Sequence, residues 1–155
     1  MLQSKDAETA VVEDRTAEPG AGTARPRILV AGASHTIEAV THAVGDAGDI
    51  VPARSVEHAL LRLQSRVDIV VCDVRFDDSR MFDFLQKLKE RPPDPECRVV
   101  CVRTSGARLS PNLRKAIAQA LEALGVEVFV DLQEVALDRG KEAARETLRR
   151  IVLGA

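Results

Sequence analysis

The sequence predicts a doubly wound α/β fold, a three-layer sandwich in which helices cover both faces of a parallel sheet. Five short runs rich in Val and Ile alternate with five segments whose apolar residues recur at helical spacing. The connections between them are short, so each strand–helix–strand unit is expected to cross over right-handed and to keep successive strands parallel. Runs that are apolar throughout are typical of strands covered on both faces.

The five predicted strands are apolar runs bounded by polar or turn-forming residues. They span residues 28–31, 50–53, 68–73, 98–103 and 126–130. Such short runs predict strands rather than helices because Val and Ile dominate them and Gly or Pro lies nearby.

The predicted helices begin at residues that favour helix starts. Ser34, Ser55 and Ser110 are the expected N-cap or opening residues, and a proline follows Ser110 at the first helical position. Residues 74–80 are expected to form a polar loop, and the last helix is expected over residues 138–153. The expected buried faces contain Ile37, Val40, Thr41 and Val44; Val56, Ala59, Leu60 and Leu63; Met81, Phe84, Leu85 and Leu88; Leu113, Ile117, Leu121 and Leu124; and Ala144, Leu148, Ile151 and Val152.

The length and composition fit one domain preceded by a tail. The chain has 155 residues, and residues 1–26 lack periodic apolar spacing, so we expect a flexible tail followed by a folded domain at 27–155. A net charge of −2 and an aromatic content of 3% argue against nucleic acid or an anionic membrane as a partner. The N-terminal segment lacks the apolar block of a signal peptide, so a cytoplasmic location is expected.

The cysteines and histidines do not form a recognisable metal or disulfide pattern. Cys72, Cys97 and Cys101 lie in or beside predicted strands, where free thiols usually act as small apolar side chains. A redox role for Cys72 and Cys101 requires their side chains to face each other across adjacent strands. The three histidines are expected at the surface; they are His35, His42 and His58.

Asp73 is the most informative candidate for a functional residue. It ends the apolar run 68–73, and ligands of open α/β sheets bind at the carboxyl ends of the strands. A carboxylate there is either a ligand-binding group or a residue that merely caps the following turn.

With Asp73 at the end of the third strand of a (βα)5 chain, the sequence resembles the receiver domains of two-component response regulators over residues 27–153. Asp68–Asp73 resembles the phosphoacceptor strand, and Arg54–Leu60 resembles the second strand and the entry to its helix. Thr104 matches the hydroxyl residue after the fourth strand, and Phe129 in Gly125–Val130 matches the switch aromatic. The resemblance implies a flavodoxin-like fold with strand order 2-1-3-4-5, Asp73 as phosphoacceptor, and Thr104 and Phe129 as switch residues.

The sequence departs from the receiver pattern where the pattern binds metal and phosphate. Gly32 and Ala33 replace the acidic pair that holds Mg²⁺, and Leu132 replaces the lysine after the fifth strand. Further departures are Gln133 for a proline, and Asp77 and Met81 in the loop that normally contains Pro and Gly. Without hard oxygen ligands, Mg²⁺ binding is expected to be weak or absent, and no cofactor is expected.

Asp77 and Asp78 are the alternative candidates for a metal site. They follow Asp73 by four and five residues, so they are either replacement Mg²⁺ ligands or part of a solvated turn, and the turn is the more common case.

The sequence leaves three possible functions. The first is a stand-alone pseudo-receiver, a phosphorylation-independent protein–protein interaction module in bacterial two-component-type signalling. No enzymatic activity is expected of it. Its expected partners are other signalling proteins, such as a histidine kinase or a regulator, or a second copy bound through the fourth helix, fifth strand and last helix. The alternative is an atypical single-domain response regulator that a histidine kinase phosphorylates on Asp73. A remote alternative is a Rossmann-like nucleotide-binding protein, because Leu29–Ser34 resembles the opening of a short-chain dehydrogenase.

Overall fold

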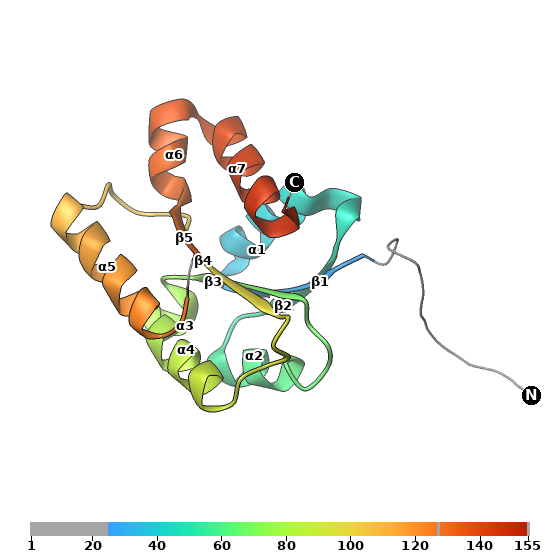
Figure 1. Cartoon of the computed structure of the whole chain (residues 1–155). Helices are drawn as coiled ribbons and strands as arrows, with labels where there is room; N and C mark the ends of the chain where they lie inside the picture. Colours follow the sequence, from blue (N-terminus) through green and yellow to red (C-terminus); the bar gives the residue numbers. More distant parts are fainter. Residues whose placement is uncertain (1–24, 127, 155) are drawn as a thin grey trace, which may run out of the picture.

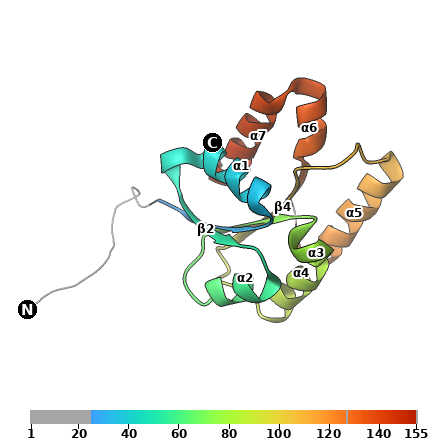
Figure 2. The same cartoon turned by 180° about the vertical axis from the view of Figure 1, so that it is seen from behind.

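The computed structural model describes residues 25–126 and 128–154, and it confirms the predicted fold. Five parallel strands form one sheet in the order β2-β1-β3-β4-β5. The helices lie in two layers, with α1, α6 and α7 on one face of the sheet and α2, α4 and α5 on the other (Figures 1 and 2). Residues 1–24 of the predicted tail lie outside the described residues.

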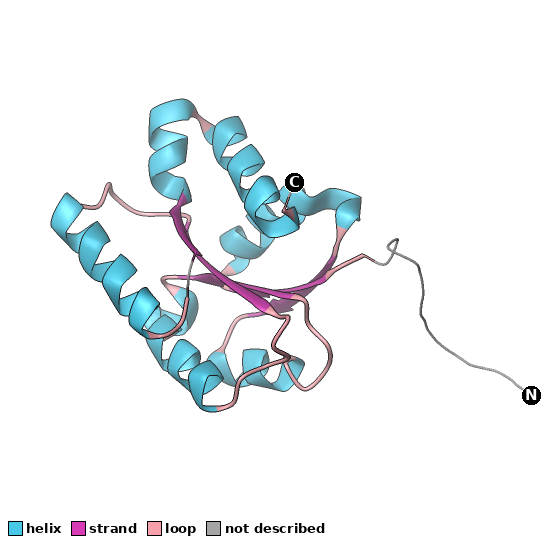
Figure 3. Cartoon of the chain, in the orientation of Figure 1, coloured by secondary structure: helices cyan, strands magenta, loops and turns pink. Residues whose placement is uncertain are grey.

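The strands and helices alternate along the chain (Figure 3). The strands are β1 Arg27–Ala31, β2 Asp49–Ala53, β3 Ile69–Asp73, β4 Arg98–Arg103 and β5 Val128–Asp131. The helices are α1 Ser34–Val44, the 3₁₀ turn η2 Gly45–Ala47, α2 Val56–Arg62, α3 Phe76–Ser79, α4 Met81–Glu90, α5 Pro111–Ala123, α6 Leu132–Arg139 and α7 Lys141–Leu153.

The core consists of two clusters, one on each face of the sheet. Alternate residues of the central strands point to opposite faces, so Val70 packs with Phe84 on one face while Val71 packs with Leu148 on the other. All five residues of β3 are buried, as predicted for a strand between two helical layers. The carboxyl end of β3 therefore lies at the centre of one edge of the sheet.

Two of the three predicted helix caps are confirmed. Ser55 accepts a hydrogen bond from the backbone of His58, and Ser110 accepts one from the backbone of Leu113. The prediction for Ser34 was wrong, because Ala33 occupies the N-cap position and provides no side-chain oxygen.

Two predicted helix faces were wrong in part. Thr41 is exposed and donates its hydroxyl to the carbonyl of Ile37, whereas Thr36 is buried. On α5, Leu121 is buried but Leu113 is 50% exposed, because the first half of this helix projects past the edge of the sheet (Figure 1).

The segment after β3, labelled α3, is a tight turn in which Asp77, Asp78 and Ser79 have positive φ, and it differs from the predicted polar loop at Phe76. The Phe76 side chain is fully buried against Phe84 with ring centroids 5.5 Å apart. An aromatic ring gains enough from burial to draw this polar segment into the core.

The chain after β5 also differs from the prediction of one helix at 138–153. Helix α6 begins directly at Leu132, and Asp131 caps it by accepting a hydrogen bond from the backbone of Glu134. The chain bends at Gly140, where φ is +95°, and α7 follows. Glycine accommodates this positive φ without the strain that a Cβ would bring.

Candidate functional site

Asp73 lies at the carboxyl end of β3, between β1 and β4. Its backbone pairs in register with Val102 of β4, and the preceding residue, Cys72, pairs with Ala31 of β1. The residue is only 2% exposed, although its carboxylate ends a strand. The structure thus places the predicted site residue at the ligand-binding edge of the sheet but encloses its side chain.

Two threonine hydroxyls and one backbone amide enclose the Asp73 carboxylate. Thr104 Oγ1 donates to Asp73 Oδ2 at 2.6 Å, and Thr36 Oγ1 donates to the same oxygen at 3.0 Å. The other oxygen, Oδ1, accepts from the backbone N–H of Arg75 at 2.8 Å. The two hydroxyls are also 3.0 Å apart, so they form one continuous polar cluster over the carboxylate.

Thr104 was predicted at this site, whereas Thr36 was not. Thr36 lies in the first turn of α1 and is fully buried, a rare setting for a polar side chain unless it is hydrogen-bonded. Thr36 and Asp73 are 37 residues apart, so no local sequence pattern predicts their contact.

Position 32 does not leave space for a metal ligand. A Cβ atom at Gly32 would lie 2.9 Å from Thr36 Cβ and 3.4 Å from Asp73 Cβ, so Thr36 fills the space that a side chain at position 32 needs. Ala33 is exposed and forms the N-cap of α1.

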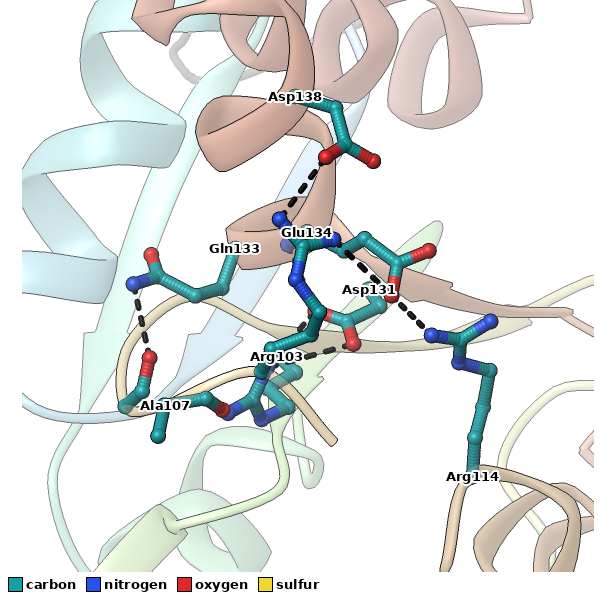
Figure 4. A network of polar contacts seen from close by, with 9 residues as sticks. Arg103, Ala107, Arg114, Asp131, Gln133, Glu134 and Asp138 are labelled. Atoms are coloured by element: carbon teal, nitrogen blue, oxygen red, sulfur yellow. Dashed lines mark hydrogen bonds and ion pairs between the residues drawn. The ribbon is translucent and has the colours of Figure 1, made fainter. Parts of the chain in front are cut away.

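Leu132 and Gln133 likewise place no cation beside Asp73. Leu132 is 4% exposed and packs in the core with Leu148, while Gln133 Nε2 donates to the carbonyl of Gly106 at 2.9 Å. Arg103, which immediately precedes Thr104, is buried, but its guanidinium pairs with Asp131 at 3.0 Å. Figure 4 shows this pair within a larger polar network.

Asp77 and Asp78 do not join Asp73 in a metal site. Asp77 Oδ2 accepts from the backbone of Val56, at the start of α2, at 2.8 Å and pairs with Arg80 at 3.1 Å. Asp78 is exposed and, like Asp77, has a positive φ. Asp78 thus lies in a solvated turn, as expected, whereas the Asp77 side chain instead joins the start of α2 to Arg80.

The residues around Asp73 do not fit Mg²⁺. Both Asp73 oxygens already accept hydrogen bonds, and octahedral Mg²⁺ requires several free oxygen ligands. Among residues 25–126 and 128–154, the structure contains no cluster of three His, Cys, Asp or Glu side chains able to hold a metal ion.

Phe129, the predicted switch aromatic, lies in β5 in register with Cys101 of β4. Its partly buried side chain packs against the core cluster that contains Cys101. This placement agrees with a packing role, and the switch role stays a prediction.

Cys72 and Cys101 are register partners on adjacent strands, and both are buried free thiols. Burial raises the pKa of the Cys72 thiol well above its usual value and, with a smaller contribution from Asp73, raises the pKa of Cys101 to about 12. Both are therefore protonated near neutral pH and are poor nucleophiles.

The three histidines are exposed, as predicted. His35 and His42 line a groove of about 500 Å³ between α1 and the α6–α7 pair, and Thr104 reaches the same groove. His42 Nε2 contacts the guanidinium of Arg145 on α7 at 2.5 Å.

No helix in the described part of the chain is long and apolar enough to cross a membrane.

The comparisons with known proteins identify the fold through structure alone. No family model and no curated protein matches the sequence. Among solved structures, the chemotaxis response regulator CheY4 of Vibrio cholerae is similar at 19% identity and a TM-score of 0.61, covering 83% of this chain and 100% of that chain.

Two further response regulators show the same similarity. The phosphorylated cyanobacterial phytochrome response regulator RcpA has 16% identity and a TM-score of 0.65, covering 84% of this chain and 95% of its own. The Mn²⁺-bound response regulator Rcp1 has 15% identity and a TM-score of 0.63, covering 81% and 91%. The strand order and these similarities agree, so the chain has the flavodoxin-like fold of response regulator receiver domains.

Proposed function

We propose that this protein is a pseudo-receiver, a protein–protein interaction module of two-component-type signalling whose output does not depend on phosphorylation of Asp73. The receiver fold supports the signalling class, and the enclosed carboxylate supports the independence from phosphate. In this proposal the protein is not an enzyme and uses no metal or cofactor.

The observation on which the proposal rests is the hydrogen bonding of Asp73 to Thr36 and Thr104. A carboxylate that accepts a phosphoryl group must present one oxygen to the phosphorus atom in line with the leaving group. Here Oδ2 accepts two hydroxyl hydrogen bonds, and the residue is 2% exposed. A phosphodonor would have to displace at least one hydroxyl before it could react.

The surroundings of Asp73 also lack the charges that stabilise phosphoryl transfer. Metal and cation contacts to the transferred oxygens supply most of the catalysis in such reactions. Gly32 and Leu132 offer neither a metal ligand nor an ammonium group. Losing both should remove several kcal/mol of transition-state stabilisation, on the order of a thousandfold or more in rate.

The face formed by α5, β5 and the α6–α7 pair is the proposed interaction surface. β5 is an edge strand, and Leu113 on α5 and Leu137 on α6 are 50% and 51% exposed. Exposed leucines beside an open strand edge suit a protein partner. The partner would be a signalling protein such as a histidine kinase or a regulator, or a second copy of this chain.

The alternative is that Asp73 is phosphorylated despite its surroundings. Its position at the carboxyl end of β3 with the Thr104 hydroxyl beside it favours this alternative. In this case a histidine kinase would donate the phosphoryl group, and Thr104 would move as the site accepts it.

One experiment distinguishes the pseudo-receiver from a receiver that is phosphorylated on Asp73. The purified chain is incubated with Mg²⁺ and beryllofluoride, and its thermal unfolding is compared with that of Asp73→Asn. We expect equal and negligible shifts in both proteins. A stabilisation that the wild-type protein shows and Asp73→Asn lacks would establish the alternative instead.

The interaction surface has its own test. Leu113→Asp on α5 is compared with Leu61→Asp on α2, where Leu61 is 58% exposed on a helix that packs on β2, the edge strand farthest from β5. Self-association is measured by sedimentation, and binding by pulldown with candidate histidine kinases and regulators. We expect Leu113→Asp to abolish the association and Leu61→Asp to retain it. A strictly monomeric wild-type protein that recovers no partner would argue against the proposal.

A further inference from the structure

We propose that the ion pair between Arg103 and Asp131 is a conformational clamp that holds the β4–α5 loop, residues 104–110, so that Thr104 stays on Asp73. The clamp would fix α5, and with it the proposed interaction surface, in one position. This inference rests on the proposed function, since it explains why that surface would not respond to chemistry at Asp73.

The Arg103–Asp131 pair is buried where two paired strands end. Arg103 is the last residue of β4, and Asp131 is its register partner at the end of β5. Arg103 Nη1 donates to both Asp131 oxygens, at 3.0 and 3.3 Å, and the two side chains are each 7% exposed. Breaking such a pair would leave a buried charge without a partner, so the pair resists opening.

The Arg103–Asp131 pair also contacts the β4–α5 loop (Figure 4). The other terminal nitrogen of Arg103, Nη2, donates to the carbonyl of Ala107. Gly106 lies beside the guanidinium with φ of +101°, and a Cβ atom there would be 3.1 Å from Nη2. The loop therefore wraps around Arg103, and glycine at this position permits the close approach.

The same loop is also attached to α6. Gln133 Nε2 donates to the carbonyl of Gly106 at 2.9 Å. Arg108 pairs with Asp138 at 2.9 Å, and Arg114 in the first turn of α5 pairs with Glu134. Each exposed contact contributes little alone, but all of them tie the loop and α5 to α6, whose cap is Asp131 itself.

The covalent chain transmits the restraint from Arg103 to Thr104, which binds Asp73. Thr104 directly follows Arg103, and the clamp holds the chain again at residues 106 and 107. Only two residues, Thr104 and Ser105, lie between the two anchored points, so the Thr104 hydroxyl has little freedom to leave Asp73 Oδ2. The clamp thus positions Thr104, although neither the Arg103 side chain nor that of Asp131 hydrogen-bonds to the Asp73 carboxylate in the described structure.

The experiment uses three variants and a matched control in the full-length chain. Arg103→Met/Asp131→Ser removes the pair without leaving a buried charge and retains a capping hydroxyl for α6. Arg103→Met alone and the milder Gln133→Ala form a graded series. Arg98→Met is the control, because Arg98 lies on the same strand but binds the carbonyls of Ile151 and Val152 at the opposite end.

Two readouts are measured in each protein: amide hydrogen exchange of residues 104–110, and labelling of the Asp73 carboxylate by carbodiimide and glycine ethyl ester. We expect the double variant to raise loop exchange and Asp73 labelling at least tenfold each, while exchange in β1 and β3 changes less than twofold. Gln133→Ala should raise both readouts by a smaller factor, and Arg98→Met should raise neither.

The outcomes are distinguishable from a failure of the proposed function. Loop exchange that stays at the wild-type level in a folded double variant would overturn the clamp, and so would faster loop exchange without increased Asp73 labelling. If Arg103→Met fails to fold, Gln133→Ala and the double variant decide the question by the same readouts. Phosphorylation of the wild-type protein would overturn the proposed function but would not change these comparisons.

Discussion

Thr104 donates a hydrogen bond of 2.6 Å to Asp73, across 31 residues of sequence, and thereby closes the edge of the sheet at which receiver folds present a carboxylate. Thr36 binds the same oxygen from the first turn of α1. The site is consequently filled from within the protein, by hydroxyl groups on two sides of the strand that bears Asp73.

Removing the Thr36 hydroxyl should destabilise the protein. Thr36→Val retains the shape of the side chain but leaves the buried Asp73 carboxylate with one donor fewer, so the free energy of unfolding should fall by about 1–3 kcal/mol. Urea denaturation measures this change. Thr41→Val is the control, since the exposed Thr41 hydroxyl binds only its own helix, and it should stay within about 0.5 kcal/mol. Equal effects of the two substitutions would contradict the account.

Restoring an acidic residue at position 32 should depend on Thr36. In Gly32→Asp the new Cβ atom would lie 2.9 Å from Thr36 Cβ, and overpacking of this kind costs about 1–3 kcal/mol. Gly32→Asp/Thr36→Ala removes Thr36 Cγ2, which would lie 3.0 Å from the new Cβ atom, so it should recover part of that loss although Thr36 Cβ stays in place. It should also be the variant that gains Mg²⁺ affinity, measured by calorimetry. A Gly32→Asp protein as stable as wild type would show that Thr36 does not fill this space.

Replacing one partner of the clamp should lower the free energy of unfolding more than replacing both partners. Arg103→Met leaves Asp131 as an unpaired buried charge, and the free energy of unfolding should fall by about 3–5 kcal/mol. Arg103→Met/Asp131→Ser should lose less, because no charge is left buried. A double-mutant cycle in urea provides the comparison. Additive losses would mean that the two side chains do not interact appreciably.

The thiols should react slowly in the folded protein. Burial raises the pKa of Cys101 to about 12 and that of Cys97 to about 11, and it raises the pKa of Cys72 as well, so little thiolate exists at pH 8. Labelling with a disulfide reagent should be slow in the native state and complete for all three in urea. Rapid native labelling of Cys72 or Cys101 would contradict their burial.

The same pKa shifts predict how stability depends on pH. The folded-state pKa of these thiols is raised, so the unfolded chain loses its thiol protons first as pH increases. Their contribution to stability is fully present below pH 9, the ordinary value, and declines as pH rises towards 11–12. Urea denaturation between pH 8 and 11 should show this loss, and replacing Cys101 with Ala should reduce it.

The sheet and most of the helices could be predicted from local sequence alone. The apolar runs that form β3 and β4 are continuous, and the proline after Ser110 marks the start of α5. Local periodicity failed at Leu113, because spacing shows which residues share a helix face but not whether the sheet extends far enough to cover it. It also failed after β5, where the capping role of Asp131 starts a helix that apolar spacing does not reveal.

The candidate site could be predicted only in part. Asp73 and Thr104 stand at the ends of predicted strands, so their meeting follows from the topology of the sheet. The pairing of Thr36 with Asp73 and that of Arg103 with Asp131 join residues 37 and 28 positions apart. Neither pair leaves a sequence pattern, since a buried threonine or arginine is recognisable only once the surrounding elements are packed.

The most direct test is to incubate the purified protein with Mg²⁺ and acetyl phosphate and to measure the intact mass, with Asp73→Asn and an active receiver domain as controls. We expect a phosphoryl adduct on the active receiver and none on this protein within the same time. An adduct that forms on this protein at a comparable rate and disappears in Asp73→Asn would contradict this expectation.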